Sequence, residues 1–187
     1  MVESTSLRNQ FLVAMPGMVD GHFNQTVTYL CEHTPEGAMG LVINRPTTLD
    51  LREMLEHMGL NGERLITHST PVFWGGPVQP ERGFVLHHAA KHWESTLRVS
   101  DELSVTTSKD ILVAISNGEG PEHYLVTLGY AGWDAGQLED EILSNSWLNT
   151  PAASDIIFSA LPTTRWEAAA RLLGVDVHLL SSHSGHA

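Results

Sequence analysis

The sequence predicts a single α+β domain, and three observations support that class. Runs of β-branched and aromatic residues dominate the first half of the chain, whereas extended and helical patterns alternate in the second half. Hydrophobic residues make up 42% of the 187 residues and charged residues 17%, a balance that allows a buried core. No linker or fixed-period repeat divides the chain, so we expect one domain over residues 1–180 and a flexible polar tail over residues 181–187.

The expected strands are short apolar runs bounded by turn residues. The runs over residues 27–32 and 38–44 are separated by a turn that contains proline and glycine, which predicts a β-hairpin. Pro46 is expected to end the second of these strands, because proline has no N–H for the ladder. The other strands are expected over residues 11–15, 72–74, 83–87, 103–106 and 124–130. The last run is apolar on both faces, which predicts a central position in the sheet.

About four helices are expected from apolar periodicity and capping residues. The clearest follows Asp50, which has Glu53 three residues later as a capping-box partner, and it ends at Gly59. Its apolar residues are spaced i, i+3, i+4 and i+7: Leu51, Met54, Leu55 and Met58. Three more helices are expected to be capped by Thr107, Asp134 and Thr164, with Asp110, Gln137 and Glu167 as the box partners.

The net charge of the chain indicates which classes of partner are disfavoured. The chain carries 10 Lys+Arg against 22 Asp+Glu, for a net charge of −12, and its basic residues are scattered. Binding to a nucleic acid is driven by basic side chains, so this charge argues against direct contact with DNA, and it equally disfavours an anionic membrane surface. No export signal or apolar run of about 18 residues is visible, and Cys31 is the single cysteine, so we expect a cytoplasmic protein.

Standard catalytic motifs are absent from the sequence. It contains no G-x-S-x-G elbow, no phosphate-binding P-loop and no C-x-x-C pair, and no cofactor is implied. Cys31 lies inside an apolar strand and is expected to be a small buried hydrophobe rather than a nucleophile.

His88 and His92 are the candidate metal ligands among eleven histidines. Their i, i+4 spacing would place two imidazoles on one face of a helix, as zinc sites require. However, the segment follows a strand and has no helical face. A solvated surface loop is therefore the favoured interpretation.

Asp20 and His22 are the candidate acid and base. They lie in the loop over residues 15–23, directly after the first strand, where loop residues can meet at a cleft. The alternative is an Asx turn supported by the neighbouring Gly21.

Two glycine-rich segments, residues 74–78 and 129–134, could bring the backbone close to a ligand. The second is expected to lead from a strand into a helix, whose free N–H groups could hold an anion. Asp134 as the cap would repel a phosphate there, so close packing of helix on sheet is the favoured reason for these glycines.

Three ordered blocks of sequence resemble the AlgH/YqgE family of bacterial proteins. They are residues 11–47 (FLVAMPGMVDGHFNQTVTYLCEHTPEGAMGLVINRPT), residues 72–87 (VFWGGPVQPERGFVLH) and residues 128–138 (LGYAGWDAGQL), the last continuing to Asn145-Ser146-Trp147. The resemblance covers about residues 7–180. The histidine cluster after the second block lies outside the pattern.

This resemblance implies a fold and a general role. Members of the family have an α+β fold with a forked, mostly antiparallel sheet that closes into a pseudo-barrel, and they are cytosolic. The family name comes from a presumed regulator of alginate production, and its members are often labelled transcriptional regulators. No catalytic residues are agreed for the family, so none is transferred to this chain.

The first functional hypothesis is a non-enzymatic regulatory module that binds a small ligand or a partner protein. Its site would use loop residues that have no capping or core role: Asn44, Arg45, Gly75, Gly76, Arg82, Tyr130 and Gly132. If the pseudo-barrel brings Arg45 and Arg82 together, they would recognise an anion. The alternative is an unrecognised enzyme, such as a hydrolase that uses Asp20 and His22. A homodimer could use aromatic residues such as Trp93 and Trp147, although these two do not establish one.

Overall fold

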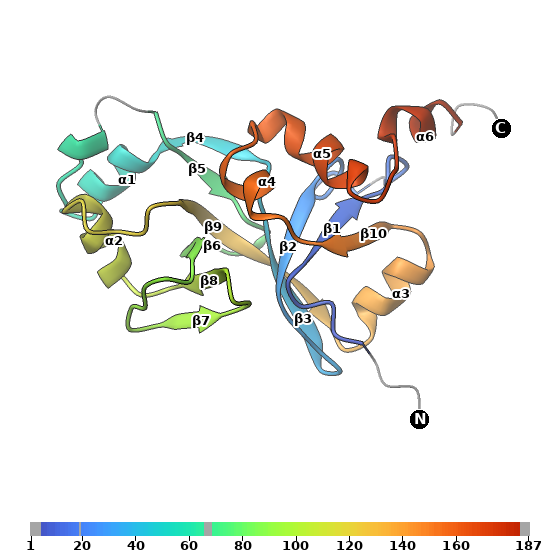
Figure 1. Cartoon of the computed structure of the whole chain (residues 1–187), viewed down its shortest axis with the longest axis horizontal. Helices are drawn as coiled ribbons and strands as arrows, with labels where there is room; N and C mark the ends of the chain where they lie inside the picture. Colours follow the sequence, from blue (N-terminus) through green and yellow to red (C-terminus); the bar gives the residue numbers. More distant parts are fainter. Residues whose placement is uncertain (1–4, 19, 66–68, 184–187) are drawn as a thin grey trace.

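The computed structural model describes residues 5–18, 20–65 and 69–183. In this part of the chain ten strands form one sheet in the order β10-β1-β2-β3-β9-β6-β8-β7, with β4 and β5 off this path (Figure 1). Among the strand pairs of these residues, only β5 with β9 is parallel. The strands are β1 Gln10–Ala14, β2 Val27–Thr34, β3 Gly37–Val42, β4 Pro46–Asp50, β5 Pro71–Trp74, β6 Val78–His88, β7 Thr96–Arg98, β8 Leu103–Thr106, β9 Tyr124–Asp134 and β10 Trp147–Pro151.

The sheet forks along β9, which is central as predicted. The first half of β9 lies between β6 and the parallel β5, whereas its second half pairs with β3. β3 in turn forms the predicted hairpin with β2, with Thr34 opposite Gly37 at the turn. The forked, mostly antiparallel sheet expected from the family resemblance is therefore confirmed.

The sheet curls into a half-barrel. Phe11 and Tyr29, from β1 and β2, share one buried cluster with Phe84 and Val105, from β6 and β8 near the other end of the strand order. Helices α4 and α5 cover part of this concave side, where the Trp166 indole donates to the Ala14 carbonyl at 2.9 Å. Strands that are far apart in the order thus bury apolar side chains in common.

Two further clusters attach helices to the other face of the sheet. α1 and α2 pack over Val85 and Val126 at one end of the molecule, and α3 packs over Trp133 and Trp147 at the other end (Figure 1). The α-helices are α1 Leu51–His57, α2 Asp110–Ser116, α3 Gln137–Leu143, α4 Ser154–Phe158, α5 Arg165–Arg171 and α6 Val177–His183, and two 3₁₀ turns cover Glu63–Leu65 and Pro162–Thr164. The described residues thus contain six α-helices instead of the expected four. The two additional helices, α4 and α6, carry no capping box that would have marked them in the sequence.

The first helix begins and is capped as predicted, α5 begins at the predicted position without the predicted cap bond, and α2 and α3 begin elsewhere. Asp50 Oδ1 accepts from the Arg52 N–H at 2.9 Å, and Gly59 has a φ of 76° after the last turn. The predicted caps Thr107 and Asp134 fail, because α2 begins at Asp110 and Asp134 is still part of β9. Thr164 directly precedes α5, but its hydroxyl donates to the Leu161 carbonyl and accepts from no N–H of the helix.

The prediction for Pro46 was wrong, and the first residues of the expected tail belong to a helix. Pro46 starts β4 rather than ending β3, which is tolerated because β4 pairs on one side only, with β5. Residues 181–183 belong to α6, whereas residues 184–187 lie outside the described residues. None of the helices in the described ranges has the length and apolar content needed to cross a membrane.

Candidate functional site

The candidate site is a cavity of about 780 Å³ on the concave side of the half-barrel. Side chains from six strands line it, among them Met39 of β3, Phe84 of β6, Leu97 of β7 and Tyr130 of β9. A volume of this size is in the range of sites for small molecules. Arg82, Tyr130 and Gly132, which the sequence marks as candidate binding residues, all line this cavity.

The strand register explains which side chains reach the cavity. Glu32, Met39 and Gly132 lie opposite one another across β2, β3 and β9, and directly opposed residues point to the same face. The intervening row is His33, Ala38 and Trp133, which points to the other face, against α3. Residues 129–134, predicted as a turn before a helix, are therefore strand residues that alternate between two faces, and no helix N-terminus is available to hold an anion there.

Charged and aromatic groups line the cavity. Three carboxylates line it, those of Glu32, Glu36 and Asp134, against the single guanidinium of Arg82. The Arg82 guanidinium lies over the Phe84 ring at 5.4 Å, and Phe84 packs edge-on against Tyr130 at 5.7 Å. The cavity therefore offers hydrogen-bonding groups, an aromatic wall and an excess of negative charge.

Arg45 and Asn44 lie elsewhere and have structural partners. They line a separate hollow of about 530 Å³ beside Trp166. The Arg45 guanidinium donates to the carbonyls of His22 and Asn24 and lies 5.4 Å from the Trp74 ring, and burial lowers its pKa.

Asn44 Oδ1 accepts from the Val27 N–H, and its Nδ2 donates to the Gln25 carbonyl, both at 2.9 Å. Both residues therefore hold the segment before β2 in place. The structure does not bring Arg45 and Arg82 together.

Gly75 and Gly76 form a chain crossing. They connect β5, on one side of β9, to β6 on the other side, so their backbone passes directly against that of β9. A Cβ on Gly76 would lie 2.0 Å from the Tyr130 carbonyl carbon, and a Cβ on Gly129 would lie 2.3 Å from the Gly76 oxygen. Both Gly75 and Gly76 are buried, and close backbone packing accounts for these glycines.

Asp20 and His22 form the Asx turn that was the alternative interpretation. Asp20 Oδ1 accepts from the His22 N–H at 2.8 Å, and the His22 ring stacks on Trp74 with centroids 6.2 Å apart. Both residues are exposed, and neither lines the half-barrel cavity. This geometry gives the acid–base hypothesis no shared cleft in which to act.

His88 and His92 do not share a helix face. His88 ends β6, where its ring packs 5.0 Å from Phe158, and His92 lies in the loop beyond. Within the described residues, no group of three or more histidine, cysteine or acidic side chains is placed to hold a metal ion. Cys31 is fully buried, and burial raises the pKa of its thiol.

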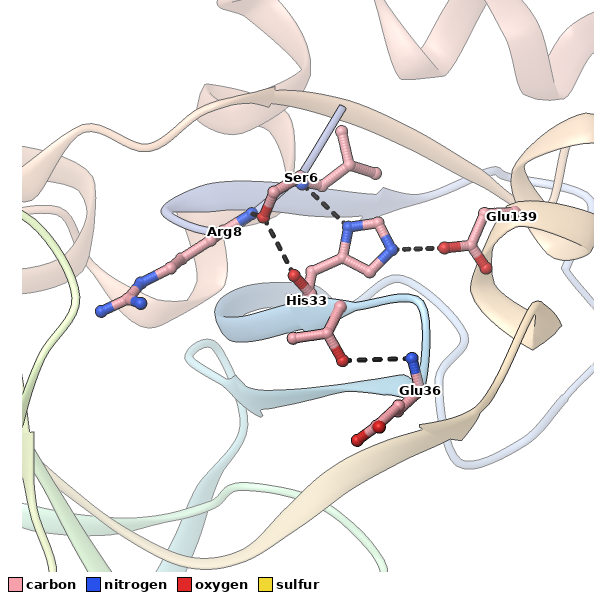
Figure 2. A network of polar contacts seen from close by, with 7 residues as sticks. Ser6, Arg8, His33, Glu36 and Glu139 are labelled. Carbon is pink, nitrogen blue, oxygen red and sulfur yellow. Dashed lines mark hydrogen bonds and ion pairs between the residues drawn. The ribbon is translucent and has the colours of Figure 1, made fainter. Parts of the chain in front are cut away.

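A polar network around His33 was not expected from the sequence. His33 Nδ1 accepts from the Leu7 N–H at 2.8 Å, so Nε2 carries the proton and donates to Glu139 (Figure 2). This hydrogen bond lowers the pKa of the Glu139 carboxyl. Beside it, Arg8 donates to the carbonyls of Arg98 and Val99 and so ties the start of the chain to the β7 end of the sheet.

Arg165 is a second residue that the sequence analysis missed. It is 5% exposed, donates to the Ala160 and Ile43 carbonyls, and lies over the Phe73 ring at 5.2 Å. Burial lowers its pKa to about 10. Arg165 thus ties α5 to the strands.

The two tryptophans considered for a homodimer face have contacts within the chain. Trp147 is 2% exposed, and Trp93 is half-buried with its ring edge-on to that of His87 at 5.1 Å. Neither offers an open aromatic face for a second copy.

Comparison with known proteins places the chain in a family. A family model described as AlgH-like matches residues 11–178. The chain is 54% identical to a UPF0301 protein of Thioalkalivibrio sulfidiphilus over the full length of both, and 52% identical to one from Methylococcus capsulatus over 98% of each.

Solved structures also resemble the chain, among them the following two. The solution structure of the AlgH protein from Pseudomonas aeruginosa has a TM-score of 0.80 at 49% identity and covers 100% of this chain and 99% of that one. A Corynebacterium diphtheriae protein shares the fold, with a TM-score of 0.72 at 19% identity over 92% of this chain and 90% of its own. The chain belongs to the AlgH-like family.

Proposed function

We propose that this chain is a non-enzymatic regulatory module whose binding site is the half-barrel cavity. The observation that carries the proposal is the convergence of Arg82, Tyr130 and Gly132 on one hollow of about 780 Å³. A pocket of this kind, with an apolar wall and a few convergent polar groups, is the usual form of a binding site. Catalysis by Asp20 and His22 has no comparable support, because the Asp20 carboxylate is held in a backbone turn.

A role in transcription would be indirect in this proposal. The chain has a net charge of −12, and three of the four charged side chains that line the cavity are acidic. An acidic surface repels the phosphates of DNA, so the module would act through a ligand or a protein partner in the cytoplasm.

A thermal-shift screen tests the proposal. The library should contain nucleotides, acidic metabolites and amines, and it should be run on the wild type and on Gly132→Leu. A Cβ at Gly132 meets nothing closer than Tyr130 Cε2 at 3.5 Å, so the leucine side chain can extend into the cavity. A ligand present at 100 times its Kd stabilises by about 2.7 kcal/mol, which raises the Tm by roughly 5–11 °C in a chain of this size.

The Gly132→Leu variant shows whether a stabilising compound binds in the half-barrel cavity. Compounds that raise the Tm of the wild type should leave that of Gly132→Leu unchanged, whereas Arg45→Gln, in the separate hollow, should respond like the wild type. A library without a single stabilising compound, or compounds that stabilise Gly132→Leu equally, would contradict the proposed site.

A further inference from the structure

The second half of β9 has an unpaired edge inside the cavity. Residues 131–134 of β9 pair with β3 on one side, whereas on the other side the pairing with β6 ends at Val78 opposite Tyr130. No other strand of the described ranges continues β6 along this edge. The cavity occupies that position, because Gly132, Trp133 and Asp134 line it.

The backbone groups of Gly132 point toward this edge. The Trp133 carbonyl faces β3, since a Cβ on Gly37 would lie 2.4 Å from its oxygen. Successive residues of a strand direct their N–H and C=O to opposite edges, so those of Gly132 face the cavity. The N–H of Asp134 has the same direction and donates to Gln137 Oε1 at 2.9 Å, away from β3. Gly132 thus presents one donor and one acceptor to whatever enters.

We propose that the occupant of the cavity is an extended, basic segment of a partner protein, which adds to the sheet as a strand beside β9. This inference rests on the proposed function, because it specifies what that site binds. Strand addition at a free sheet edge uses backbone hydrogen bonds for affinity and alternate side chains for specificity. Gly132 has no side chain on the concave face, which leaves room there for the side chain of the added strand.

The negative charge of the residues that line the cavity favours a basic segment. Glu32 and Asp134 lie on the concave face, and Glu36 lies in the turn between β2 and β3. None of the ion pairs formed by the described residues involves these three carboxylates. The apolar side chains of Leu97 and Val105 also line the cavity, and Arg82 is the one basic side chain among the lining residues. A strand that alternates apolar and basic residues would match the apolar and the acidic lining residues, and the net charge of −12 would attract it.

The test uses a fluorescein-labelled peptide of four Val-Lys repeats, with four Val-Glu repeats as the control, and measures anisotropy. Two variants of Gly132 distinguish the loss of a backbone hydrogen bond from the effect of added side-chain volume. Gly132→Ala keeps the N–H, and its Cβ makes only ordinary contacts. Gly132→Pro removes the N–H, and proline is tolerated at an unpaired edge. We expect the affinity of Gly132→Ala to stay within about twofold of the wild type and that of Gly132→Pro to fall roughly tenfold.

Two further measurements keep the test decisive if Gly132→Pro fails to fold. Asp134→Asn should weaken the Val-Lys peptide several-fold, and added salt should weaken it in the wild type. Amide exchange at residues 131–134 of the wild type should slow when the peptide is added. Equal binding of both peptides, or unchanged exchange at this edge, would overturn the inference.

The failure of this inference can be told from failure of the proposed function. Suppose that small molecules stabilise the wild type but not Gly132→Leu, and that neither peptide binds. The proposed function would then hold for a small ligand, and strand addition would be rejected. A dimer in solution that Gly132→Pro dissociates would show that a second copy of this chain occupies the edge, which also rejects a basic partner segment.

Discussion

Replacement of Gly76 by alanine would put a methyl group where the backbone of β9 already lies. Its Cβ would be 2.0 Å from the Tyr130 carbonyl carbon, 2.2 Å from that oxygen and 2.3 Å from the Ala131 nitrogen. Since ordinary carbon contacts begin near 3.4 Å, the two backbones must separate by about 1.4 Å. Overpacking that side chains can absorb costs about 1–3 kcal/mol, and here backbone atoms must move on both sides. We therefore expect a loss of about 3 kcal/mol or more.

Thermal and urea unfolding measure this loss. A destabilisation of about 3 kcal/mol lowers the Tm by roughly 6–12 °C in a chain of this size, and the urea midpoint should fall with an unchanged m-value. Gly132→Ala is the matched control, because its Cβ would meet only Tyr130 Cε2 at 3.5 Å and Val78 Cγ2 at 3.9 Å. Its stability should change by less than about 0.5 kcal/mol. Equal losses at the two glycines would refute the distinction between a chain crossing and an open binding edge.

Three further predictions concern buried or paired groups. Burial raises the pKa of the Cys31 thiol. A thiol reagent at pH 8 should therefore label Cys31 slowly in the native protein and fast in urea. Rapid labelling of the native protein would contradict the burial of this thiol. The hydrogen bond from His33 lowers the pKa of the Glu139 carboxyl in the folded state. The ionised carboxylate therefore stabilises the fold fully above the pKa of the unfolded state. This stabilisation is lost as the pH falls through the pKa of the folded state. The stability difference between the wild type and Glu139→Gln should therefore be largest near neutral pH and shrink in acid, and urea titrations that show it growing in acid would reverse the sign. Arg165→Met removes the donors to two carbonyls on a buried side chain, which should cost roughly 2–4 kcal/mol in urea unfolding, and a neutral result would show that water replaces them.

Local patterns in the sequence predicted much of the fold. The helix after Asp50 was predicted well because its cap and its apolar face depend on residues three or four positions apart. The hairpin of β2 and β3 depends on a short turn, and the apolar pattern of residues 124–130 reflects packing of Leu125 and Val126 into two different buried clusters. Each of these features is decided by neighbours along the chain.

The candidate site was predicted only in part, because residues of one type can serve a scaffold or a site. Arg45 and Arg82 are both arginines outside the strands expected from the sequence, yet Arg45 donates to backbone carbonyls whereas Arg82 lies in β6 and lines the cavity. The contact of His33 with Glu139 joins positions 106 residues apart, and no local pattern signals it.

The sequence by itself determined the α+β class, the central strand and the acidic character, since these follow from composition and short-range periodicity. Only the tertiary structure decided which glycines serve packing and which border a cavity. Gly76 must be glycine because a segment from β5 crosses β9 there, and Gly132 borders open space because β6 stops pairing at Val78. Both outcomes depend on where distant strands pass one another, and that is set by the curl of the whole sheet rather than by the residues beside each glycine.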